Sequence, residues 1–458
     1  MTIDPKIFKA YDIRAVYPTE INEENIVPII RAIYSFFKED LKKQTITIAL
    51  GRDMRVSSPS LFQIAKDTLL KVGAHIVDVG LVSTPTFYFA VSHYGYDCGI
   101  QITASHNPKE YNGVKFVKNS PHGLIKIGKS TGMEKVMDLS IKGVMLEEKE
   151  GMFEENSHVQ VDEVQNALSL FNNPVLDTFT IVADPANAMG ITYIEELFQH
   201  IPGNLVRMNF TLDGTFPSHQ PDPLNFDNLK DLQKKVIETK ANIGLAPDGD
   251  GDRLFFIDEK GQVIPASIIT ALIAREFLKT NPGALILFDI RYVLTPSKIV
   301  EENNGRSLVT KVGHAYITEA LTGSGGLFAG ESSAHYFYKA SGNAESQVIT
   351  ILTVLKVLSE EKKPLSEIVE ELRRSYESGE INFTVGNAQE IMNVVTEKYK
   401  DGSLDALDGV SISYPQWRVN LRTSNTEPLL RLNLEAKEKS VMESKRDEMV
   451  ELIKQHSR

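Results

Sequence analysis

The amino-acid sequence predicts an α/β protein with three tandem α/β domains of similar topology, followed by a smaller C-terminal α+β domain. Two observations lead to this fold class. Three times along the chain an apolar, β-rich run ends in a polar loop and continues into a helical pattern, as in a βα unit. After the third unit the pattern changes to two helices and then to strands that enclose one further helix. We expect the four domains at residues 1–152, 153–255, 256–368 and 369–458.

The three βα units account for the first three domains in order. Their strands and helices are Thr45–Leu50 with Ser60–Val72, Thr180–Ala183 with Ile191–His200, and Ala284–Phe288 with a helix from Thr295. Apolar residues three to four positions apart predict two helices next, at Glu345–Ser359 and Pro364–Tyr376. The last domain is predicted to contain, in chain order, the segment Ile381–Val385, a helix at Ala388–Tyr399, strands at Gly409–Tyr414, Trp417–Leu421 and Leu429–Ala436, and a charged helix at Lys437–His456.

The composition is that of an ordinary soluble globular protein, with 42% hydrophobic and 24% charged residues among 458. The formal net charge of −12 gives the chain no general attraction for nucleic acid or an anionic membrane. An anionic ligand must therefore meet a local cluster of Arg and Lys. The single cysteine, Cys98, cannot form an intrachain disulfide and lies in an apolar run, which predicts a buried thiol. With no signal-like N-terminal segment and no uncharged run of membrane-spanning length, we expect a cytoplasmic protein.

The polar segment Thr103–Lys115 follows the apolar run Cys98–Ile102 and contains two turn signals, Asn-Pro and Asn-Gly. Ser105 stands where the run gives way to the loop. A hydroxyl at a strand end suits a nucleophile that nearby cations or a metal activate. In an extended chain the side chain of His106 points to the opposite face, so a direct Ser–His pair is not expected. Taken alone, a turn-forming serine is nearly as good an interpretation.

Three carboxylates alternate with glycines at Asp248, Asp250 and Asp252, between two apolar runs. Carboxylates in this pattern can converge on one hard cation such as Mg²⁺, and glycine permits the backbone angles that such a loop needs. An EF-hand loop begins similarly, but its sixth position requires Gly and here is Arg253, and the flanks resemble strands. A haloacid-dehalogenase signature matches only minimally, and a polar hairpin is the remaining alternative. Because three close carboxylates would repel one another without a cation, the sequence predicts a metal site.

A loop at Gly330–Phe337 carries groups suited to a sugar. Glu331 and Ser333 offer an acceptor and a donor for sugar hydroxyls, and His335 can titrate near neutrality. On its own, a glycine-bounded loop of this kind is more often only a loop.

A second loop, between two strands of the last domain, carries groups suited to a phosphate. Arg422 supplies a guanidinium fork, and Ser424, Asn425 and Thr426 supply small donors beside it. The alternative is a turn rich in Thr and Asn.

Together these segments resemble the α-D-phosphohexomutases, in particular bacterial and archaeal phosphomannomutase/phosphoglucomutase. The matching segments follow the family order over nearly the whole chain: Phe8–Arg14, Gly51–Arg55, Thr84-Pro85, Thr103–Lys115, Phe216–Pro223, Asp248–Arg253, Asp289–Arg291, Lys311–His314, Gly330–Phe337 and Arg422–Pro428. Thr-Ala-Ser-His-Asn-Pro and Asp-Gly-Asp-Gly-Asp-Arg are the most specific of them.

The resemblance implies four domains around a central cleft and an enzyme that interconverts the 1-phosphate and 6-phosphate of mannose or glucose. Ser105 would be a phosphoserine that completes a Mg²⁺ site with the three aspartates, and a hexose 1,6-bisphosphate would be the intermediate and activator. Four residues would lie at the transferring phosphoryl group: Lys115, Arg14, His106 and Arg253. His314 and His335 would lie beside the reacting sugar, and Arg291, Lys311, Glu331 and Ser333 would bind the substrate. The phosphate that is not transferred would be held by Arg422, Ser424, Asn425 and Thr426.

Several departures from the family pattern leave the preferred sugar open. Ser332 stands where many relatives have Met, Arg291 where Lys is frequent, and Ala15 and Ala334 where Gly is common. Phosphoglucosamine mutase is the neighbouring activity, and a non-catalytic phosphosugar-binding protein or a haloacid-dehalogenase-type phosphatase are alternatives from other classes. We expect a monomer or weak homo-oligomer that binds phosphosugars and neither nucleic acid nor membrane.

Overall fold

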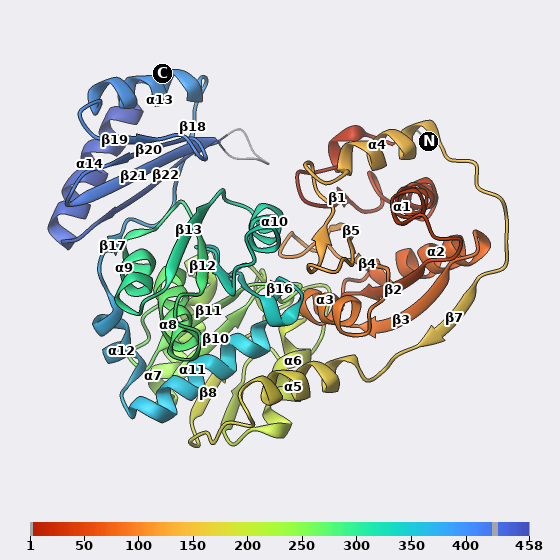
Figure 1. The fold of residues 1–458 in the computed structure, drawn as a ribbon, viewed down its shortest axis with the longest axis horizontal. Coiled ribbons are helices and arrows are strands. Elements are labelled where there is room, and N and C mark those ends of the chain that lie inside the picture. The colour runs from red at the N-terminus through yellow and green to blue at the C-terminus, as the bar shows by residue number, and fades with distance from the viewer. Residues whose placement is uncertain (1–2, 424–428, 458) are drawn as a thin grey trace.

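A computed structural model describes residues 3–423 and 429–457, and its four β-sheets follow one another along the chain (Figure 1). In the first sheet the strand order is β1-β5-β4-β2-β3-β7, with β6 paired to β5. The elements of this domain are η1 (Pro5–Ile7), β1 (Ile13–Val16), α1 (Ile26–Leu41), β2 (Thr47–Arg52), α2 (Ser58–Lys71), β3 (His75–Leu81), α3 (Thr84–His93), β4 (Cys98–Ile102), β5 (Tyr111–Lys118), β6 (Ile125–Lys126), α4 (Met133–Lys142) and β7 (Met152–Glu155).

The second and third sheets have the orders β11-β10-β8-β9 and β13-β12-β14-β15-β16. The second domain contains α5 (Val159–Leu170), β8 (Thr180–Ala183), α6 (Gly190–His200), β9 (Asn204–Arg207), η2 (Phe226–Leu229), α7 (Lys230–Thr239), β10 (Ile243–Pro247) and β11 (Leu254–Asp258). The third contains α8 (Ala266–Thr280), β12 (Leu285–Asp289), α9 (Leu294–Glu302), β13 (Arg306–Thr310), α10 (His314–Ser324), β14 (Phe328–Gly330), β15 (Tyr336–Tyr338), η3 (Lys339–Ser341), β16 (Ala344–Glu345), α11 (Gln347–Glu361) and α12 (Leu365–Leu372).

The prediction of three α/β domains of similar topology is confirmed by a shared four-strand unit. Its order is β3-β2-β4-β5 in the first domain, β9-β8-β10-β11 in the second and β13-β12-β14-β15 in the third. In each unit three strands are parallel and the fourth is antiparallel. Loops at the carboxyl ends of such parallel strands are the usual place for a functional site, and the polar loops singled out in the first three domains follow β4, β10 and β14.

The fourth domain is an antiparallel sheet of order β17-β22-β21-β20-β19, with β18 paired to β22, and it carries two helices. Its elements are β17 (Tyr376–Glu377), β18 (Ile381–Thr384), α13 (Ala388–Lys398), β19 (Ser403–Asp405), β20 (Val410–Ser413), β21 (Trp417–Thr423), β22 (Leu429–Ala436) and α14 (Lys439–Gln455). The predicted α+β character is therefore correct.

Of the two helices predicted before this domain, the first has the expected length but lies two residues further along the chain, and the second is shorter than expected. The first begins at Gln347, because Ser346 caps it by accepting a hydrogen bond from the Ile349 N–H and because Glu345 pairs with Phe337 in the sheet. The second ends at Leu372, since the backbone is extended at Arg373 and leads into β17.

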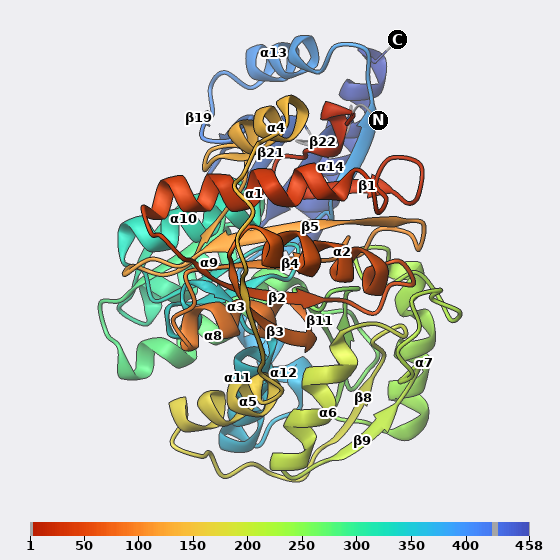
Figure 2. The same cartoon turned by 90° about the vertical axis from the view of Figure 1, so that its right-hand side faces the viewer.

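The hydrophobic cores show which domains share a buried interior. A continuous core runs from Val164 to Leu372 through the second and third domains, whereas the fourth domain buries its own cluster around Trp417 and Leu432. The first domain has its own large cluster and buries Cys98, as expected, and a smaller cluster joins this domain to α5 and β16. The fourth domain lies at the upper left in Figure 1 and at the top in Figure 2. No helix in the described part of the chain is long and apolar enough to cross a membrane.

A buried carboxyl at the contact between the first two domains gives a prediction on stability. Glu163 in α5 accepts a hydrogen bond from the Thr86 hydroxyl at 2.7 Å, and burial raises the pKa of Glu163 from 4.5 to about 7. A carboxyl whose pKa is raised by folding destabilises the fold as pH rises from 4.5 to about 7, at ~1.4 kcal/mol per pH unit for one proton. We expect Glu163→Gln to flatten the fall of the melting temperature over this range. Glu155→Gln, at an exposed carboxylate of β7, should leave the fall unchanged, and an equal flattening by both variants would contradict the assignment.

Candidate active site

Ser105 lies in the loop after β4, and its backbone has a left-handed φ of 51°. The Ser105 N–H donates to the Thr103 hydroxyl at 3.1 Å, and the Ser105 Oγ lies 3.2 Å from Asp248 Oδ2. It also lies 3.1 Å from Nδ1 of His106. The expectation that these two neighbours point apart was wrong, because it assumed an extended chain. The left-handed turn at Ser105 brings the two side chains to the same side.

Arg55 holds the loop that carries Ser105. This fully buried guanidinium donates to the backbone carbonyls of Ser105 and Asn107 at 2.7 Å each, of Pro108 at 2.8 Å and of Tyr111 at 2.9 Å. Four carbonyl groups on one guanidinium fix the curvature of the loop, because each would otherwise need another donor.

Removal of this guanidinium should disturb the loop. We expect Arg55→Met to lower the melting temperature and to reduce kcat about 10- to 100-fold, since small misplacements of a reacting group carry costs of this size. The matched control is Arg52→Met, at a half-buried arginine of β2 that holds none of these carbonyls. Activity measured at a temperature where both variants are folded checks the prediction, and equal activity of the two would contradict it.

The three aspartates lie on the loop that joins the antiparallel strands β10 and β11, and all three are buried. Their ligand atoms lie within 4.8 Å of one another. Gly249 allows this loop to approach the Ser105 loop, because a Cβ there would lie 2.3 Å from the Ser105 carbonyl oxygen. The two loops from different domains therefore meet backbone to backbone.

Cations and hydroxyls around the cluster offset only part of its charge. Lys115 Nζ donates to Asp250 Oδ2 and Asp252 Oδ2 at 2.6 Å each, and the Thr84 hydroxyl donates to Asp250 Oδ2 at 2.7 Å. Burial lowers the pKa of Lys115, but the two carboxylates raise it well above its usual value. Burial and the two neighbouring aspartates raise the pKa of Asp248. Asp250 Oδ1 is buried and accepts no hydrogen bond from the described residues. An all-oxygen donor set with such an oxygen fits a hard divalent cation.

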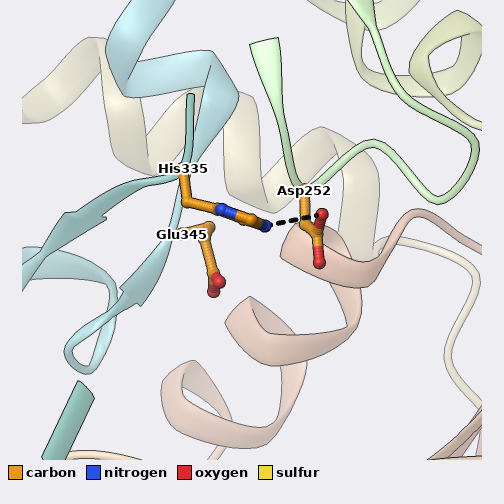
Figure 3. Close-up of side chains that lie close together, drawn as sticks. All are labelled: Asp252, His335 and Glu345. Carbon is orange, nitrogen blue, oxygen red and sulfur yellow. Dashed lines mark ion pairs between the residues drawn. The ribbon is translucent and has the colours of Figure 1, made fainter. Parts of the chain in front are cut away.

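A second group of potential ligands, Asp252, His335 and Glu345, overlaps the first (Figure 3). Its charges are already paired, because Glu345 binds Lys126 at 2.5 Å and His335 Nε2 lies 3.2 Å from Asp252 Oδ1. Burial lowers the pKa of His335, but Asp252 and Glu331 raise it to about 9. A protonated imidazole does not bind a metal, so this second group is better explained as an ion-pair network.

The loop predicted to bind a sugar connects to the same network. His335 Nδ1 lies 2.9 Å from Glu331 Oε2 and 2.9 Å from the Ser333 hydroxyl. Glu331 Oε1 accepts from the Gly313 N–H at 3.0 Å and lies 3.2 Å from Arg291 Nη2. Burial raises the pKa of Glu331, but His335 and Arg291 hold it well below its usual value. This loop therefore presents an ionised carboxylate beside a hydroxyl and an imidazolium.

His314 and Lys311 occupy different environments. His314 is buried against the Tyr11 ring, with Lys126 Nζ 3.4 Å from its Nδ1, and burial and Lys126 lower its pKa well below the usual value. Lys311 is exposed, and its Nζ lies 6.0 Å from the centre of the Tyr316 ring. The structure thus brings His314 to the other site groups and leaves Lys311 outside them.

Arg14 and Arg253 lie next to the two loops that carry Ser105 and the aspartates. Arg14 donates to Asp12 at 2.8 Å and to Asn107 Oδ1 at 2.6 Å. The Arg253 N–H donates to Asp248 Oδ1 at 3.1 Å, and Arg253 Nε lies 3.4 Å from His335 Nε2. The guanidinium of Arg14 therefore contacts the Ser105 loop through Asn107, and that of Arg253 lies beside His335.

In the fourth domain, Arg422 is buried and donates to Glu380 at 2.7 Å. The other predicted phosphate-binding residues, Ser424, Asn425 and Thr426, lie outside the described residues.

Sequence reasoning did not assign several residues that shape this site. The segment containing Arg55 was recognised, yet nothing in it shows that Arg55 reaches the Ser105 loop. That contact depends on β2 and β4 being neighbours in the sheet. Lys126, Glu345 and Glu380 carry no motif at all, since each acts through a partner more than 40 positions away in the chain.

Family models match the chain in four consecutive parts. They are phosphoglucomutase/phosphomannomutase α/β/α domain I at residues 5–131, domain II at 161–261, domain III at 265–376, and the C-terminal domain of the same family at 380–452.

Individual relatives match over almost their full length. The chain is 37% identical over 455 residues to a phosphomannomutase of Methanocaldococcus jannaschii, covering 98% of both chains. It is 33% identical to a protein named phosphohexose mutases from Xanthomonas campestris pv. campestris, covering 98% of this chain and 99% of the relative. A crystal structure of a phosphoglucomutase/phosphomannomutase family protein from Burkholderia thailandensis superposes with a TM-score of 0.87 at 29% identity, covering 99% and 98% of the two chains.

Proposed function

The chain belongs to the phosphoglucomutase/phosphomannomutase family of phosphohexose mutases, and we propose that it interconverts the 1-phosphate and 6-phosphate of mannose or glucose through a phosphoserine at Ser105. One observation carries the proposal. The Ser105 hydroxyl lies 3.2 Å from Asp248 within a buried group of three aspartates, and Lys115 reaches the other two. A hydroxyl placed among a metal-type donor set and cations is suited to carry a phosphoryl group.

The three aspartates, with an oxygen of phosphorylated Ser105, would hold one Mg²⁺. The buried Asp250 oxygen without a hydrogen-bond donor among the described residues supports this assignment. When bound, the ion neutralises charge on the phosphoryl group and weakens the bond to Ser105. Lys115, Arg14 and Arg253 add fixed positive charge around the same group, which phosphoryl transfer requires more than covalent chemistry.

The reaction proceeds in two half-reactions in this proposal. The bond between phosphorus and Ser105 Oγ breaks while a bond to the free hydroxyl of a hexose 1-phosphate forms, which gives a hexose 1,6-bisphosphate. The hydroxyl loses its proton to a neighbouring base, for which the buried, neutral His314 is the candidate. The bisphosphate then turns end for end, its other phosphate returns to Ser105, and hexose 6-phosphate leaves. Added bisphosphate would act as activator by rephosphorylating Ser105.

Residues of the other domains would hold the parts of the substrate that do not react. Glu331 and Ser333 would bind two sugar hydroxyls, with His335 and Arg291 fixing the carboxylate of Glu331. Arg422 and its loop would grip the phosphate at the far end. That domain must bind either phosphate in turn, so it has to release and close again in each cycle.

The proposal is tested with mannose, glucose and glucosamine 1-phosphates, each with Mg²⁺ and a trace of the matching 1,6-bisphosphate. We expect 6-phosphate to form from mannose or glucose 1-phosphate. Preference for glucosamine would indicate a phosphoglucosamine mutase, and turnover of none would leave a phosphosugar-binding protein. The names of the relatives, phosphomannomutase and phosphohexose mutases, favour the first outcome.

A further inference from the structure

A carboxylate of the chain itself sits on the arginines that line one face of the fourth domain. Glu380, in the loop between β17 and β18, lies 2.7 Å from Arg422 Nη2 and 2.9 Å from Arg431 Nη1. Arg291 of the third domain approaches the same carboxylate, with Nη1 at 3.8 Å from Oε2. The Glu380 side chain is 24% exposed, while those of Arg291 and Arg422 are 8% and 3% exposed. One accessible anion therefore faces guanidinium groups from two domains.

The sheet register explains why an anion is needed there. Arg422 in β21 and Arg431 in β22 are directly opposite each other in the antiparallel pair. Like charges placed opposite one another across a strand pair are destabilising unless a counter-charge lies between them. Glu380 supplies this charge with one oxygen on each arginine. Burial and the neighbouring Arg291 lower the pKa of Arg422, which agrees with strong crowding of positive charge.

A phosphate monoester could replace the carboxylate in this arrangement. It presents more oxygens and a charge of nearly −2 near neutral pH, and guanidinium groups bind it through two parallel hydrogen bonds. Arg422 Nε is buried and has no hydrogen-bond acceptor among the described residues, so a phosphate that replaces Glu380 on Nη2 would meet this second donor beside it. Binding of a phosphate here would require Glu380 to move away, since both anions need the same donors.

We propose that Glu380 is a built-in competitor for the substrate phosphate, which occupies the Arg422–Arg431 pair between binding events and weakens the grip on either phosphate of the bisphosphate. This inference rests on the proposed function for its role in turnover, although the competition itself is a statement about anion binding. A site that held phosphate too firmly would slow the release on which the end-for-end turn depends. Glu380 would therefore be a positioning and tuning residue and not a catalytic one.

Direct binding tests the competition without turnover. Both proteins in this experiment carry Ser105→Ala, and one of them also carries Glu380→Gln. Their binding of inorganic phosphate and of glucose 6-phosphate is measured by calorimetry. If Glu380 occupies the Arg422–Arg431 pair most of the time, the apparent Kd for phosphate equals the intrinsic Kd divided by the fraction of time that the pair is free. We therefore expect the Gln variant to bind both ligands about tenfold more tightly. Glu380→Asp, which keeps the charge, should stay close to the parent.

Glu397→Gln is the matched control, because Glu397 is an exposed glutamate of the same domain that pairs only with Lys400 in the described structure. It changes the net charge equally and should leave both Kd values unchanged. With Ser105 intact, Glu380→Gln should lower KM and kcat together, because tighter binding slows release. Added phosphate should also raise the melting temperature of the Gln variant more than that of the parent.

The possible outcomes separate the two proposals. Weaker or equal phosphate binding by Glu380→Gln would overturn the competition and show that Glu380 only positions the arginines. Absence of phosphate binding in both proteins would overturn it as well. Tighter binding of inorganic phosphate by the Gln variant, in a protein that converts no hexose phosphate, would support the competition and contradict the mutase function.

Discussion

Ser105→Ala is expected to reduce kcat/KM for the interconversion of hexose phosphates by about 10⁴-fold or more, the scale seen when an essential nucleophile is removed. The physical reason is that the other groups around the site supply charge but no atom that can carry the phosphoryl group. Lys115, Arg14 and Arg253 would still surround the bound phosphate, so binding of hexose 6-phosphate should change little. Coupled assays of 6-phosphate formation and calorimetry with hexose 6-phosphate check the two parts separately.

A useful control for this variant is Ser58→Ala. Ser58 is also a buried serine of the first domain, but its hydroxyl donates to Asp53 and lies away from the three aspartates. We expect near-normal turnover once the variant is folded. If Ser105→Ala kept full activity while Asp248→Asn lost it together with a covalent phosphoaspartate, a phosphatase mechanism of the haloacid-dehalogenase type would replace the present account.

Asp250→Asn should have the second largest effect. The substitution removes one of the three proposed ligand carboxylates and leaves Lys115 with one, Asp252, of the two carboxylates that it binds in the described structure. We expect the affinity for Mg²⁺ to fall about 100-fold, since even indirect partners of a metal site contribute 10- to 100-fold. Turnover at fixed Mg²⁺ should fall with it and recover in part at high Mg²⁺. Calorimetric titration of Mg²⁺ measures the affinity independently of activity.

Glu345→Gln distinguishes the two overlapping groups of potential ligands. Glu345 belongs to the group with Asp252 and His335. In this group the carboxylate of Glu345 is paired with Lys126, and that of Asp252 with the imidazolium of His335. If the metal site is the aspartate cluster, this variant should bind Mg²⁺ with the affinity of the parent, although the lost partner of Lys126 should lower the melting temperature. A loss of Mg²⁺ affinity equal to that of Asp250→Asn would place the ion in the other group.

The sequence predicts best those parts of the site that are local in the chain. The three aspartates alternate with glycine within five positions, so their clustering on one hairpin loop followed from the spacing itself. The βα units were equally local, because an apolar run and the helix after it are neighbours in the chain. Three α/β domains and a different fourth one could be predicted for the same reason.

The features that could not be predicted depend on backbone angles or on contacts between distant segments. The Ser105–His106 contact depends on a left-handed residue, a conformation that serine seldom adopts and that no neighbouring residue announces. Arg55 reaches the Ser105 loop only because β2 and β4 pair. Glu380 meets Arg291 only because the fourth domain is placed against the third. Motifs mark residues whose chemistry is needed, whereas these supporting residues become visible only in three dimensions.

The central claim is that Ser105 passes its phosphoryl group to the sugar. The most direct test labels the protein with ³²P from a labelled hexose 1,6-bisphosphate and mixes it with unlabelled hexose 1-phosphate for a single turnover. We expect the label to leave Ser105 no more slowly than product forms, and to appear first in the bisphosphate and then in hexose 6-phosphate. If the label stayed on Ser105 while hexose 6-phosphate accumulated, the phosphoserine would not be the phosphoryl carrier.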